Sequence, residues 1–154
     1  MRVIDRALVD EVWREVTAYP PGRQAAEAEE FLERQPDAAA FCQAVTRELD
    51  VAVQRAAIGL AFLIFKIREA SLGAPVPPLA RSRIREAYEA TTDWLERREE
   101  GGGEFPHRNL VQYLVEWVDA DEEAKATLFL LLKTLSDALD TPHPASPQRG
   151  EEKR

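Results

Sequence analysis

Two pairs of carboxylates stand at helical spacing in this chain of 154 residues, and together they could bind a metal ion. Glu86 and Glu89 form the first pair, and Glu116 and Asp119 form the second. Residues three apart share one side of a helix, so each pair would present its two carboxylates together. Two facing helices so equipped could hold Mg²⁺ through hard oxygen ligands, and the metal would bridge the phosphates of a substrate.

This spacing resembles the Glu-x-x-Glu and Glu-x-x-Asp motifs of the all-α nucleoside triphosphate pyrophosphohydrolases. The resemblance covers those four residues, and it implies a magnesium-dependent enzyme that hydrolyses nucleotides, with all four carboxylates as ligands. The other interpretation is a solvated helix face crossed by ion pairs between neighbouring turns. Because the chain holds 28 acidic residues, such pairs also arise from composition alone. The enzyme is therefore the alternative function.

Other signals of catalysis are sparse. Glu104 and His107 have the Glu-x-x-His spacing of di-iron helical bundles, but Pro106 places Glu104 ahead of a helix, and His143 is the only other histidine. The sequence has no glycine-rich phosphate loop, no Cys/His metal spacing and no Ser/His/Asp set. We therefore expect no cofactor, no metal and no catalytic residue.

The composition indicates which classes of partner and which cellular compartment to expect. The chain has 20 basic and 28 acidic residues and a net charge of −8, so it would repel nucleic acid. Its single cysteine, Cys42, suits a reducing cytoplasm and is expected to be a buried structural thiol. Residues 56–67 carry Lys66 as their only charge, but this run is shorter than the roughly 20 apolar residues that span a membrane. We expect a cytoplasmic protein without a membrane segment.

Helical periodicity dominates the chain, and strand signals are nearly absent. A Pro-Pro-Gly sequence stops the first helix, and the second helix covers residues 23–34. As one helix, residues 36–72 would span about 55 Å, which exceeds the roughly 40 Å width of a compact domain of this size. This segment therefore either bends near Asp50 or Gly59, or projects and packs against another subunit.

The second half predicts three more helices. The fourth covers residues 79–99, and Pro106 opens the fifth. Asp119, followed three residues later by Glu122, resembles a capping box for the last helix. That helix carries five consecutive large apolar residues, 128–132, which is more than one buried stripe requires.

These elements predict an all-α fold, a single-domain bundle of about six helices around a long, largely buried central helix. The domain covers residues 1–140, and residues 141–154 form a disordered, proline-rich, charged tail.

Three arginines, Arg81, Arg83 and Arg85, cluster at the start of the fourth helix, where the helix dipole disfavours positive charge. Such a cluster could accept an acidic partner or a phosphate. The plainer interpretation is pairing inside the chain, for example between Arg85 and Glu89.

A short stretch, residues 105–110 followed by Glu116-Trp117, resembles a motif of helical chaperones for redox-enzyme maturation. That resemblance implies a helical module that grips a peptide. The surplus of apolar residues on the third segment and the last helix favours burial against a second chain. We therefore expect a non-catalytic interaction module, an adaptor, regulator or chaperone-like binder. Its partners would be itself, as a homodimer, and an unknown protein. The expected contact residues are Phe62, Phe65, Phe129 and Leu132.

Overall fold

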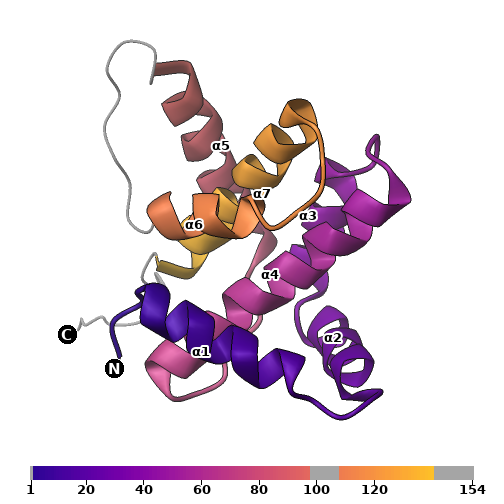
Figure 1. Cartoon of the computed structure of the whole chain (residues 1–154). Helices are drawn as coiled ribbons and strands as arrows, with labels where there is room; N and C mark the ends of the chain where they lie inside the picture. Colours follow the sequence, from indigo (N-terminus) through magenta and orange to yellow (C-terminus); the bar gives the residue numbers. More distant parts are fainter. Residues whose placement is uncertain (1, 98–107, 141–154) are drawn as a thin grey trace, which may run out of the picture.

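The computed structural model describes residues 2–97 and 108–140, and within them the chain is all helical, which confirms the predicted fold class (Figure 1). The predicted tail, Glu104 and His107 lie outside the described residues. The described part contains seven helices, where about six were predicted: α1 (Arg6–Thr17), α2 (Arg23–Arg34), α3 (Pro36–Val45), α4 (Val51–Leu72), α5 (Arg81–Arg97), α6 (Arg108–Val115) and α7 (Glu122–Asp140).

Helix α4 runs diagonally through the middle of the view in Figure 1, with α1 crossing it on one side. It contacts α1, α2, α3 and α7, while α5 and α6 pack on α7. The two helices with the apolar surplus that the sequence indicated, α4 and α7, therefore lie against each other. Among the described residues, none of the helices combines the length and the apolar character that crossing a membrane requires.

Residues 36–72 do not form one helix, because the chain ends one helix at Val45 and begins another at Val51. The turn between them is held by the side-chain amide of Gln54, which donates to the carbonyls of Thr46, Arg47 and Leu49 at 2.9–3.2 Å. These bonds satisfy carbonyls that a continuous helix would have paired internally. Of the three alternatives for this segment, the break near Asp50 is the one that the chain adopts.

The apolar surplus that the sequence indicated is mostly absorbed inside the chain. On α4, residues on several sides of the helix are buried, among them Ala57, Leu60, Ala61, Leu63, Phe65 and Ile67. On α7, three of the five consecutive apolar residues have no exposed surface, namely Leu128, Leu131 and Leu132. The part of α4 that remains apolar and accessible is a strip that includes Ala52, Ala56 and Gly59.

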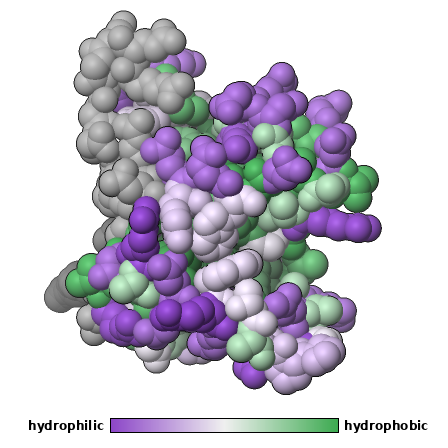
Figure 2. Space-filling view, in the orientation of Figure 1, coloured by the Kyte–Doolittle hydropathy of each residue, from purple (hydrophilic) through white to green (hydrophobic). Residues whose placement is uncertain are grey.

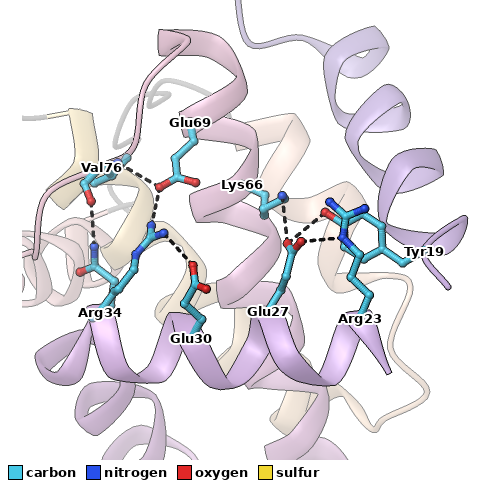
Figure 3. Close-up of polar contacts among 9 residues, drawn as sticks. Tyr19, Arg23, Glu27, Glu30, Arg34, Lys66, Glu69 and Val76 are labelled. Carbon is cyan, nitrogen blue, oxygen red and sulfur yellow. Dashed lines mark hydrogen bonds and ion pairs between the residues drawn. The ribbon is translucent and has the colours of Figure 1, made fainter. Parts of the chain in front are cut away.

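Helix α2 is fixed on α4 by a polar seam (Figure 3). The carboxylate of Glu27 accepts from Tyr19 at 3.0 Å, from Arg23 at 2.9 Å and from Lys66 on α4 at 3.2 Å. Farther along, Arg34 on α2 reaches Glu69 on α4 at 2.8 Å. Charged groups at both ends of the contact therefore set where α2 lies along α4.

Aspartate side chains cap the N-terminal ends of two helices, α1 and α7. The Asp5 side chain accepts from the Leu8 amide at the start of α1, at 3.0 Å. At the start of α7, the Asp121 side chain accepts from the Ala124 amide at 2.8 Å. The prediction of Asp119 as the cap is therefore wrong, because the helix begins two residues later than the capping-box pattern indicated.

Candidate functional site

A groove lined almost entirely by apolar side chains crosses one face of the molecule, between α1, α2, α4 and the turn after α6. Its volume is about 510 Å³. In Figure 2, pale and hydrophobic surface runs across the middle of this face toward the N-terminal end of α4, with hydrophilic surface above and below it. Apolar surface that remains accessible on a protein of this size is typical of a binding site.

The rim of this groove carries two exposed tryptophans from distant parts of the sequence. Trp13 on α1 is 42% exposed, and Trp117 in the turn after α6 is 36% exposed. Their ring centroids lie 4.8 Å apart, and Tyr113 packs edge-on against Trp117 at 5.1 Å. The Tyr113 hydroxyl donates to Asp10 on α1 at 3.1 Å, which ties α6 to α1 beneath the tryptophans. The aromatic rim is therefore assembled within the single chain.

The floor of the groove is a strip of small residues on α4. Ala52, Ala56 and Gly59 follow one another at steps of four and three, and so share one side of the helix. A Cβ atom added at Gly59 would meet nothing within 4 Å. The floor is therefore open at Gly59, and an object placed there could approach the α4 backbone closely.

The chemistry of the lining is that of a binding surface. Asp119 is the only ionisable residue among the lining side chains, and Gln24 is the only amide. Gln24 donates to the Val16 carbonyl at 2.8 Å, so its amide bridges α2 and α1. Acid–base or metal chemistry needs several converging polar groups, and this groove offers one carboxylate.

The four expected contact residues lie mostly inside the chain. Phe62 reaches the groove and is 9% exposed, whereas Phe65 and Leu132 are buried in the core. Phe129 is half-buried beside Trp94, with the ring centroids 6.4 Å apart. A partner could touch Phe62 through the groove, but it could not reach Leu132, which has no exposed surface.

The structure does not bring the four carboxylates of the predicted magnesium site together. Glu86 and Glu89 are exposed on α5, Glu116 pairs with Lys125 at 2.9 Å, and Asp119 lies on the groove. Among residues 2–97 and 108–140, no three histidine, cysteine, aspartate or glutamate side chains are grouped so that they could hold a metal ion. The helical spacing of each pair is real, but the two pairs do not converge on one site.

The chain was compared with known proteins by sequence and by structure. No protein-family model, curated protein or solved structure matches it.

One residue in the sequence, Gly59, could have indicated the groove. Gly59 lies in the middle of a strongly apolar helix, where glycine costs about 1 kcal/mol relative to alanine. The sequence suggested a bend there, yet α4 continues through it. Trp13 and Trp117 are more than a hundred positions apart in the sequence, so local sequence patterns could not reveal their contact.

Proposed function

We propose that this protein is a non-catalytic helical interaction module of the cytoplasm, and that it binds a second copy of itself through the tryptophan-rimmed groove. The groove is apolar and poor in ionisable groups, which suits a helix packed into it and does not suit a reaction. The buried, unpaired thiol of Cys42 is compatible with a reducing compartment.

The observation that carries this proposal is Gly59. A glycine inside a helix weakens it, and the fold of this chain does not require one here, because a Cβ at this position would meet no atom within 4 Å. A helix from outside the chain would benefit from the missing side chain, since small residues let two backbones approach closely. A partner helix on α4 therefore accounts for a residue that the single chain does not explain.

The tryptophans favour a second copy as that partner. Trp and Tyr are enriched where interfaces gain most of their binding energy, and here two exposed tryptophans stand beside a floor of small residues. In a two-fold symmetric dimer the same surface of both chains forms the interface. The exposed tryptophans of each chain would then pack against the groove of the other chain. The same face thus carries both the tryptophans and the floor of small residues against which they would pack.

Gly59→Leu tests the proposal, because its Cβ atom would meet no atom of the chain within 4 Å and its side chain would occupy the groove. The variant should keep its helical circular dichroism, should unfold at the same or a higher temperature when monomeric, and should lose self-association in sedimentation velocity. Ala90→Leu adds the same side chain to an exposed position on α5 and serves as the matched control; it should associate like the wild type. A wild-type chain that stays monomeric at all concentrations, or a Gly59→Leu variant that still dimerises, would overturn the proposal.

A further inference from the structure

A second groove lies between α3, α5 and α7, and it differs from the first in carrying basic residues. Its volume is about 670 Å³. Ala40, Phe41 and Ala44 line it from α3, and Tyr88 lines it from α5, with the Phe41 and Tyr88 rings edge to face at 5.7 Å. Arg81 and Arg85, both exposed on α5, line the same groove. An apolar trough is thus bordered by two guanidinium groups.

The three arginines of the sequence cluster separate into two roles. Arg83 is buried and donates to the Ala138 carbonyl near the C-terminal end of α7, at 2.5 Å, where the helix dipole favours a cation. Within the described residues, Arg81 and Arg85 form neither an ion pair nor a hydrogen bond through their side chains. The expected pair between Arg85 and Glu89 is not formed. Arg83 is thus explained by the fold, and the other two arginines are not.

The positive charges of Arg81 and Arg85 have no stabilising partner in the part of the chain that the structure describes. Arg81 is the first residue of α5, where the helix dipole repels positive charge, and Arg85 follows one turn later on the same side of the helix. Asp37 is the one acidic residue on the groove, and it lies beyond ion-pair distance of both. Residues that break a local rule without compensation inside the chain often belong to a functional site. Anionic groups of a partner would supply the missing compensation.

The length of the groove and the spacing of its arginines indicate what kind of partner would fit. Residues from Asp37 to Val45 line it, which corresponds to about 12 Å along α3, or two helical turns. Arg81 and Arg85 are one turn apart, so their spacing matches two carboxylates one turn apart on a facing helix. The net charge of −8 disfavours an acidic partner over most of the remaining surface.

We propose that this second groove binds an amphipathic helix of another protein, whose apolar stripe is flanked by carboxylates one turn apart. The stripe packs on Phe41, Ala44 and Tyr88, and the carboxylates pair with Arg81 and Arg85. This contact uses a different surface from the proposed self-association, and neither depends on the other.

A synthetic helical peptide of about 18 residues, or five turns, tests the proposal. Its leucines follow a helical stripe flanked by glutamates at i and i+4, and a scrambled peptide of the same composition is the counter-probe. Fluorescence anisotropy should show saturable binding of the amphipathic peptide to the wild-type chain, weakened by salt, and at least tenfold weaker binding of the scrambled one. Lack of binding, or equal binding of both peptides, would overturn the proposal. A chain that binds decanoate, a fatty-acid anion, and does not bind the peptide would also overturn it.

The variant R81E/R85E decides whether the arginines are responsible. Glutamates at the start of α5 suit the helix dipole, so the variant should fold at least as stably as the wild type. It should bind the amphipathic peptide at least tenfold more weakly. Arg14→Glu, an exposed change on α1 outside this groove, is the matched control and should bind like the wild type. Gly59→Leu should also bind normally, which separates this proposal from self-association. Wild-type affinity in R81E/R85E would overturn it.

Discussion

The Nζ atom of Lys66 lies 3.2 Å from the carboxylate of Glu27, and this ion pair joins α4 to α2 (Figure 3). Lys66 is the only charged residue in the apolar run of residues 56–67. Its ammonium group also lies 5.6 Å from the centre of the Tyr19 ring, and the Tyr19 hydroxyl donates to the same carboxylate. The one charge in this apolar run therefore occupies the position that faces the carboxylate of Glu27 on α2.

Glu27 should make stability depend on pH. Burial raises the pKa of its carboxyl, but hydrogen bonds from Arg23, Lys66 and Tyr19 outweigh burial and hold the pKa below its ordinary value of 4.5. A lowered pKa means that the stabilisation is present above pH 4.5 and is lost as the pH falls through the folded-state value. Burial lowers the pKa of Lys66, but its bonds to Tyr19 and Glu27 raise it above 10.5, so this contribution is lost only when the pH rises through that higher value.

Urea unfolding of Glu27→Gln across this range of pH provides the measurement. At neutral pH we expect the free energy of unfolding to fall by about 1 kcal/mol. The difference from the wild type should shrink as the pH falls below 4.5, where the carboxylate is protonated in the unfolded chain, and should vanish below the lower folded-state pKa. Glu29→Gln changes an exposed carboxylate on the same helix and should have little effect. Identical pH profiles for the two variants would contradict the role of Glu27.

Leu132 should behave as a core residue of the single chain. It is fully buried on α7, so Leu132→Ala would leave a cavity and lower the free energy of unfolding by about 2–5 kcal/mol. Leu72→Ala at the end of α4, where the leucine is 45% exposed, is the control and should cost less than about 1 kcal/mol. Denaturant unfolding at low protein concentration checks both. A near-neutral Leu132→Ala would show that this side chain is not packed in the monomer.

Cys42 should be unreactive in the folded protein. Burial on α3 raises the pKa of its thiol from an ordinary 9.0 to about 12. Because the thiolate is the reactive species, the thiolate fraction near pH 8 should drop about a thousandfold. Labelling with iodoacetamide should therefore be slow in buffer and fast in guanidinium chloride. Ser82→Cys in a Cys42→Ala background places a thiol at an exposed site on α5 and should label rapidly in both conditions.

The start of α7 offers a direct test of which aspartate is the cap. Asp121→Ala removes the acceptor of the Ala124 amide and should lower stability by about 1 kcal/mol. Asp119→Ala, at the residue that the capping-box pattern selected, should have a smaller effect. Thermal unfolding followed by circular dichroism distinguishes the two. The reverse order of effects would place the cap at Asp119.

Local signals in the sequence determined the class of fold and most of its helices. The apolar spacing of 3.6 residues per turn and the proline and glycine stops act within a few residues, so α2 was predicted with its observed bounds. The break between α3 and α4 was offered as one of three alternatives, because the apolar stripe runs through residues 46–50 unchanged. What ends the helix there is a set of side-chain bonds from Gln54, which helical periodicity does not reveal.

Only the tertiary structure decided which residues of the right type belong together. Glu86 and Glu89 have suitable local spacing, and so do Glu116 and Asp119, but packing does not group the two pairs into a metal site within the described residues. Trp13 and Trp117 meet because α1 and α6 lie side by side, and Gly59 forms an open floor because no neighbouring helix covers it. Helix formation depends on near neighbours along the chain, whereas a groove depends on surfaces from distant segments; the sequence therefore predicted the helices, and the fold located both candidate binding surfaces.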